Sequence, residues 1–293
     1  MALTQDELPA ATRRDRRPGD VGDWDSWLPS APGYQKLERA GEMGRLALAV
    51  PRKALTPPYW WIPECINETA IALRRCYVAA LLASAAFAVG LSCDFFGGIV
   101  RLLGTADRLG GGVGIGFVRE PGVWVSIMIL AGVAGSSMCA DLGARKIREE
   151  LDALQVLGVE EMRGLIVPRV VAMTLVGPIL GTFTVLVAWL ATYIAVPLVY
   201  HDSTVTLAGF VATFKAFVSP PDLINFVVKL LCAGFLVGVV CCYKGVKSSG
   251  GAEGVGRAVN EAVLISFFGV WMINILFNTV FLSLFPQVSI LKG

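Results

Sequence analysis

The stretch VVAMTLVGPILGTFTVLVAWLATYIAVPLVY, residues 170–200, decides the fold class of this chain. It carries no charged residue, and about 20 apolar residues are enough to cross the roughly 30 Å of bilayer hydrocarbon. Backbone amides in hydrocarbon must be hydrogen-bonded within their own segment, so the stretch is predicted to be a transmembrane helix. At a rise of about 1.5 Å per residue it is longer than the bilayer is thick. We therefore expect it to kink at Pro178 and Pro197 or to protrude from the membrane.

Four further runs are long enough to cross a bilayer. They are residues 76–93, 121–140, 223–243 and 262–291, and only Lys229 interrupts the third of these. The composition agrees, because charged residues make up 16% of the chain against about 25% in soluble domains. The sequence therefore predicts an all-α integral membrane protein with five transmembrane helices.

The basic residues are distributed unevenly between the two predicted sides of the membrane. Eleven Lys and Arg lie at or before Arg75, five lie in residues 144–169 and three in residues 244–257. The other side has five, and Lys229 lies within a span. Because cytoplasmic loops carry the excess of Lys and Arg, we expect the N-terminus in the cytoplasm and the C-terminus outside.

The region before the first apolar run has two parts. Residues 1–30 are rich in Pro, Gly, Arg and Asp, which is typical of a disordered cytoplasmic tail. Residues 31–72 mix basic, aromatic and aliphatic side chains, which favours an amphipathic segment in the membrane interface. We expect the prolines at 51, 57, 58 and 63 to break this segment into pieces. The five-helix transmembrane domain then occupies residues 73–293.

A charged segment at residues 144–163 lies between the second and third spans, on the predicted cytoplasmic side. Its apolar residues recur at helical spacing, and its opposite charges fall four residues apart, so one amphipathic helix ending near Gly158 is predicted. The residues concerned are Arg145, Lys146, Ile147, Arg148, Glu149, Glu150, Leu151, Asp152, Leu154, Leu157 and Gly158. Such a helix is suited to transmit force if a soluble partner binds it. Alternatively, it rests on the membrane surface.

Lys229 is the most informative charge within a span. Charges in spans usually face a cavity or a partner, so Lys229 is predicted to pair with Glu120 or Asp94, or to hold an anionic lipid head. The alternative is that its side chain reaches the outer interface, which is about 10 Å away. For Glu120 the alternative is a role at the start of the second span, near the helix dipole.

Glycine is concentrated in three places. The pairs Gly177/Gly181 and Gly234/Gly238 have the G-x-x-x-G spacing that lets membrane helices approach closely. Residues 110–116, in a predicted outer loop at 101–121, read GGGVGIG but lack the Lys-Ser/Thr of a phosphate-binding loop. After the third span, residues 207–218 are expected to form a short outer helix.

Two motifs on the predicted cytoplasmic side resemble the signature of the MlaE/YrbE permease family, the membrane subunits of MCE-type lipid ABC transporters. The first is AGVAGS (131–136), ADLGA (140–144), EELDAL (149–154), LGV (157–159) and PR (168–169); the second is YKG (243–245) and GGAEGVGRAVNEAV (250–263). Asp222 and Lys229 also fit. The pattern is most similar to the A-type member of the actinobacterial YrbE branch. It departs from the family at residues 119–122, which read REPG, and at Glu160-Glu161.

The resemblance implies a transport subunit with no catalytic residues, no metal and no cofactor of its own. It implies a bacterial inner membrane location, a second permease subunit, a cytoplasmic ATPase dimer that binds ATP, and MCE-domain proteins on the outer face. The cargo would be a lipid or fatty acid, and no nucleic acid is expected. An ion-coupled carrier or channel is the alternative function. An intramembrane enzyme would need a nucleophile with its base, and the sequence suggests no such set.

Overall fold

The computed structural model describes residues 32–98, 109–156, 160–200 and 206–284, and within these ranges every regular element is a helix. The chain divides into two compact units, residues 1–44 and 45–293. Helix α2 (Pro32–Leu55) begins in the first unit and ends in the second. All contacts described below lie within residues 45–293.

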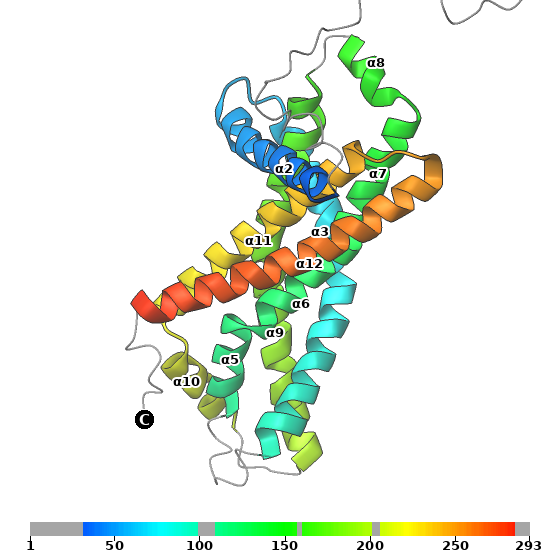
Figure 1. Ribbon diagram of the computed structural model, residues 1–293. Coiled ribbons are helices and arrows are strands. Elements are labelled where there is room, and N and C mark those ends of the chain that lie inside the picture. The colour runs from blue at the N-terminus through cyan, green and yellow to red at the C-terminus, as the bar shows by residue number, and fades with distance from the viewer. Residues whose placement is uncertain (1–31, 99–108, 157–159, 201–205, 285–293) are drawn as a thin grey trace, which may run out of the picture. The chain divides into compact units, whose positions relative to one another are not determined.

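Five helices are long and apolar enough to cross a membrane, which confirms the predicted number. They are Ile62–Ser92, Pro121–Ile147, Met162–Val199, Pro220–Val246 and Gly251–Leu284. The first comprises α3 (Ile62–Val89) and the start of a π-helical turn, η3 (Gly90–Gly97). The second comprises α6 (Pro121–Ile129), η5 (Leu130–Gly135) and α7 (Ser136–Ile147). The third comprises η6 (Met162–Ile166) and α9 (Val167–Tyr200), and the last two are α11 (Pro220–Val246) and α12 (Gly251–Leu284) (Figure 1).

The prolines act differently from the expectation. Helix α2 continues through Pro51 to Leu55, and α9 continues through both Pro178 and Pro197. Pro63 lies in the first turn of α3, where its missing N–H has no partner to lose. Residues 62–72 therefore belong to the helix of the first span and not to a separate interfacial segment.

Helices α9 and α11 pack closely through the two G-x-x-x-G pairs. A Cβ added to Gly177 would lie 2.6 Å from the Leu230 carbonyl oxygen, and one added to Gly234 would lie 2.5 Å from that of Met173. Neither contact leaves room for a methyl group. The predicted close approach is present, and the structure identifies the partners as each other's helices.

The glycine-rich run is helical and is not a loop. Helix α5 (Leu109–Arg119) contains it and packs against α10 (Leu207–Phe217), the short outer helix that the sequence predicted (Figure 1). Glycines 110, 111 and 114 face Phe210, Phe217 and Phe214, respectively, and leave no room for a Cβ. The run thus serves to seat three phenylalanine rings.

Candidate functional site

The charged segment after the second span is bent. Helix α7 ends at Ile147, and a new helix, α8 (Glu150–Val156), begins three residues later. Between them Glu149 has a φ of 58°, a left-handed conformation that costs a non-glycine residue about 1–2 kcal/mol. The turn directs Leu151 inward, where it is 2% exposed, and burying a leucine contributes about 1.5–3 kcal/mol. The burial of Leu151 thus offsets the strain at Glu149.

The bend changes the ion pairs expected for a single helix. Arg145 Nε lies 3.3 Å from Asp141 Oδ2, and Arg148 Nε lies 2.8 Å from Glu150 Oε1. Ile147 is 45% exposed although Leu151 is buried, so the predicted apolar face is divided. Leu154 is half-buried. The Asp152 side chain, Leu157 and Gly158 lie outside the described residues.

Beyond this segment, the chain returns to the membrane against residues 45–61. Lys53 Nζ donates a hydrogen bond to Glu160 Oε1. Arg163 donates to Thr56 Oγ1 at 3.0 Å and to the Pro57 carbonyl at 3.3 Å. The hydrogen bond from Lys53 holds the pKa of Glu160 below its ordinary value. Both ends of the segment are therefore attached to helices of the transmembrane domain.

Lys229 is fully buried in α11, so it does not reach the outer interface. Its ammonium group donates to the Arg119 carbonyl at 2.7 Å, to Asn274 Oδ1 at 3.0 Å and to Asn278 Oδ1 at 2.7 Å. Three oxygen acceptors satisfy the three donors of an ammonium group. The arrangement therefore stabilises a buried lysine among three helices.

Glu120 lies on the other side of the same two asparagines. Asn274 Nδ2 donates to Glu120 Oε2 at 2.6 Å, and Asn278 Nδ2 donates to Glu120 Oε1. Lys229 and Glu120 are thus joined through α12, as neither candidate residue alone could indicate. The Asp94 side chain lies outside the described residues, so its predicted pairing is not described.

Sequence reasoning missed Asn274 and Asn278. Two asparagines four residues apart in an otherwise apolar span occupy one helix face, and that spacing is the signal that could have found them. Arg119 Nε also pairs with Asp222 Oδ1 at 3.0 Å, and Asp222 is 1% exposed. We call the connected set the polar network. It consists of Arg119, Glu120, Asp222, Lys229, Asn274 and Asn278.

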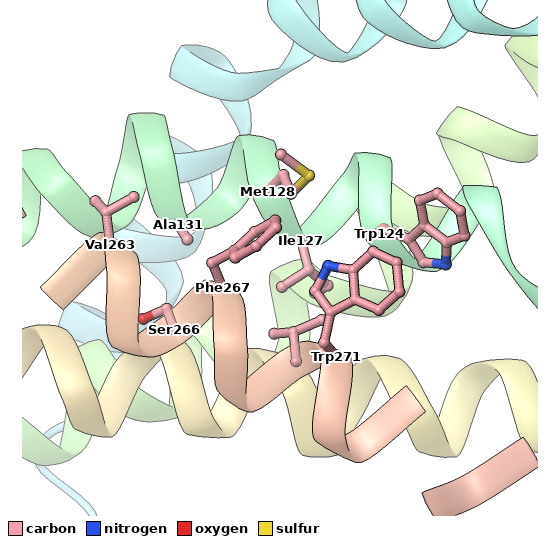
Figure 2. A pocket seen from close by; sticks show the side chains of 9 residues that line it. Trp124, Ile127, Met128, Ala131, Val263, Ser266, Phe267 and Trp271 are labelled. Atoms are coloured by element: carbon pink, nitrogen blue, oxygen red, sulfur yellow. The ribbon is translucent and has the colours of Figure 1, made fainter. Parts of the chain in front are cut away.

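An apolar groove adjoins the polar network. It has a volume of about 60 Å³ and lies between the second span and α12, lined by Trp124, Ile127, Met128, Ala131, Val263, Ser266, Phe267, Val270 and Trp271 (Figure 2). The Trp124 indole N–H donates to Glu120 Oε2 at 3.0 Å, and its ring lies 5.1 Å from that of Trp271. A tryptophan thus connects the apolar groove to the charged carboxylate. A polar group beside an apolar groove suits a ligand that has a polar head and an apolar chain.

Comparison with known proteins places this architecture in a family. A family model described as Permease MlaE matches residues 70–280. Protein TRIGALACTOSYLDIACYLGLYCEROL 1, chloroplastic, of Arabidopsis thaliana is 28% identical over 209 residues, which cover 71% of this chain and 57% of that protein. A probable ABC transporter permease protein of Rickettsia prowazekii is 29% identical over 167 residues, covering 57% of this chain and 63% of that protein.

A third relative gives the same result. A probable ABC transporter permease protein of Synechocystis is 28% identical over 171 residues, covering 58% of this chain and 64% of that protein. The chain therefore spans only about three-fifths of the length of these relatives. The family model, in contrast, extends from the first predicted span almost to the end of α12 and includes both quoted motifs. The chain belongs to the MlaE permease family.

Proposed function

We propose that this chain is the membrane-spanning permease subunit of an ABC transporter that moves lipid across the inner membrane and the cell envelope. ATP would be bound and hydrolysed by a separate ATPase subunit. Family membership supports a transport subunit in place of an enzyme. The names of the Rickettsia and Synechocystis relatives support the ABC transporter class.

The observation that carries the proposal is the attachment of α8. The second span continues without interruption into α7, and the bend at Glu149 then leads into α8. At the end of α8, Val156 is 89% exposed. Asp141, near the base of α7, bonds Arg169 of α9 at 2.6 Å. A partner that pulled on α8 would therefore move the second and third spans together.

The lipid part of the proposal is supported by the groove and the polar network. Trp124 joins an apolar lining to the Glu120 carboxylate, and the name of the Arabidopsis relative contains that of a glycerolipid. A volume of about 60 Å³ equals roughly two water molecules in the liquid, which is too small for a whole acyl chain. We infer that a second permease chain completes the cavity.

The exposed face of α12 is consistent with such a second chain. Phe268, Met272 and Leu276 recur at helical spacing and are 65%, 67% and 61% exposed. Lipid or a partner helix would cover them. MCE-domain proteins on the outer face are proposed from the resemblance of the two signature motifs.

The test uses the complete complex, in which the chain is co-expressed with its ATPase and second permease. Val156→Asp places a charge on the exposed end of α8. Ala49→Asp is the control, because Ala49 is exposed between Arg45 and Arg52 on the basic face of α2. We expect the ATPase to co-purify with wild type and with Ala49→Asp, and to be lost with Val156→Asp.

Lipid flux in reconstituted vesicles is measured with the same three proteins. ATP-driven flux should be lost only with Val156→Asp. If Val156→Asp keeps both the ATPase and the flux, α8 is not the coupling element. Flux that needs no ATPase would instead favour an ion-coupled carrier or channel.

A further inference from the structure

A polar furrow lies at the opposite end of the transmembrane domain from the polar network, at the end that carries α8. It has a volume of about 360 Å³ and lies between α3, the second span and α9. This volume falls within the range of small-molecule sites, which is about 300–1,000 Å³. Its walls are rich in charged and amide side chains, in contrast to the apolar groove of Figure 2.

The wall formed by α7 and α9 is already ion-paired. Arg169 is only 6% exposed, with Nε 3.0 Å from Glu68 and Nη2 2.6 Å from Asp141. Arg145 pairs with the same Asp141 oxygen. Because these groups neutralise one another, this wall is a fixed polar surface and does not select a net charge.

The wall formed by α3 has charge to spare. Glu64 has no ion-pair or hydrogen-bond partner among the described residues, and Arg75 donates to the Ser137 hydroxyl. Glu64, Glu68 and Arg75 are separated by four and seven residues, so they lie along one face of α3 over about three turns. The furrow thus has a carboxylate end and a guanidinium end.

The order of these charges relative to the membrane is fixed by α3. The helix enters the span at Ile62, so Glu64 and Glu68 lie near the outer edge of the domain and Arg75 lies deeper. Three acidic and three arginine side chains line the furrow in total, which makes it neutral overall. A neutral site with separated charges favours a ligand that itself carries both signs.

We propose that this furrow binds a zwitterionic headgroup that contains a phosphate and an ammonium group, supplied by a phospholipid of the adjacent leaflet. In such a lipid the phosphate lies nearer the acyl chains and the ammonium lies further out. That order matches Arg75 in the depth of the furrow and Glu64 with Glu68 at its outer edge. Guanidinium groups bind phosphate oxygens through charge-assisted hydrogen bonds, and carboxylates accept them from ammonium.

The inference rests on membrane insertion and not on the proposed transport function. A lipid held here touches α3, α7 and α9 at the base of the α8 segment, and it need not be cargo. A chain that moves no lipid can still bind phosphatidylethanolamine in the furrow, so the two proposals fail separately.

The test measures lipid binding to the purified full-length chain in a neutral detergent. Fluorescent phosphatidylethanolamine is titrated against wild type, Arg75→Gln, Glu64→Gln and the control Arg74→Gln. Arg74 is an exposed neighbour on α3 that does not line the furrow, and its replacement removes the same charge. We expect about fivefold weaker binding for Arg75→Gln and for Glu64→Gln, and no change for Arg74→Gln.

Phosphatidylglycerol separates the two ends of the furrow, because it has the phosphate but no ammonium. Its binding should weaken with Arg75→Gln and stay unchanged with Glu64→Gln. Equal losses for Arg74→Gln and Arg75→Gln, or equal binding of both lipids by all variants, would overturn the proposal.

Glycerophosphoethanolamine distinguishes the source of the headgroup. This soluble molecule presents the same phosphate and ammonium without acyl chains. If it displaces the labelled lipid only at large excess, the ligand is a membrane lipid. Displacement at concentrations equal to that of the lipid would contradict a membrane source and assign the furrow to a soluble molecule with the same charges.

Discussion

Replacing Trp124 by Phe tests whether the apolar groove and the polar network act as one site. The change removes the indole N–H that donates to Glu120 Oε2 at 3.0 Å, and it keeps an aromatic ring beside Trp271. The matched control is Trp271→Phe, which removes the same atoms from the facing ring. Among the described residues, the Trp271 indole nitrogen has no hydrogen-bond partner.

The size of the effect follows from the difference between the two variants. A hydrogen bond to a charged group contributes about 1.5–3 kcal/mol. Glu120 keeps its two asparagine donors, so we expect the lower end, about 1.5–2 kcal/mol. In a chain of this size 1 kcal/mol shifts the midpoint of thermal unfolding by about 2–4 °C. Trp124→Phe should therefore unfold about 3–8 °C below Trp271→Phe.

The assay is thermal unfolding of the purified chain in lipid nanodiscs, followed by intrinsic fluorescence with both variants in parallel. Equal midpoints for Trp124→Phe and Trp271→Phe would refute the reasoning. A double-mutant cycle with Glu120→Gln gives a second check, because the loss caused by Trp124→Phe should shrink once the carboxylate is neutral. Lipid flux should fall more with Trp124→Phe than with Trp271→Phe.

Three further changes test other parts of the structure. Gly110→Ala puts a Cβ 2.6 Å from the Phe210 carbonyl, whereas Gly112→Ala meets nothing within 4 Å, so thermal unfolding should show Gly110→Ala less stable by about 1–3 kcal/mol. Glu149→Pro forbids the observed φ of 58°, and we expect ATPase binding in pull-downs to be lost while expression is kept. Because the pKa of Glu160 is lowered by Lys53, this link stabilises the fold above the ordinary carboxyl pKa and is lost as the pH falls through the lowered value. The difference in unfolding midpoint between wild type and Glu160→Gln should therefore be present at pH 7 and vanish below about pH 4.

Much of the architecture could be predicted because it depends on local properties of the chain. Whether residues 170–200 can cross a bilayer depends on their length and apolarity alone, and the five spans follow from the same rule. The G-x-x-x-G pairs likewise predicted close helix packing, although they could not identify α9 and α11 as the partners. The glycine run at residues 110–116 was misplaced in a loop, because its reason for being glycine is the docking of α10.

The bend at Glu149 shows where local reasoning failed. Helical periodicity and charge spacing favoured one helix through residues 147–157, and no glycine marked a break. The burial of Leu151 outweighs the local preference at Glu149, and burial depends on contacts that no local pattern contains. The predicted set of coupling residues therefore lies on two short helices in place of one.

The sequence by itself determined that this chain spans the membrane five times, which segment bears the charged motif, and to which family it belongs. All three are written in contiguous residues. Only the tertiary structure decided that Lys229 meets Glu120 through Asn274 and Asn278, and that Glu64 and Arg75 share a furrow with Arg169. Glu120 and Asn274 are 154 positions apart in the chain, and groups so distant become partners only when whole helices pack.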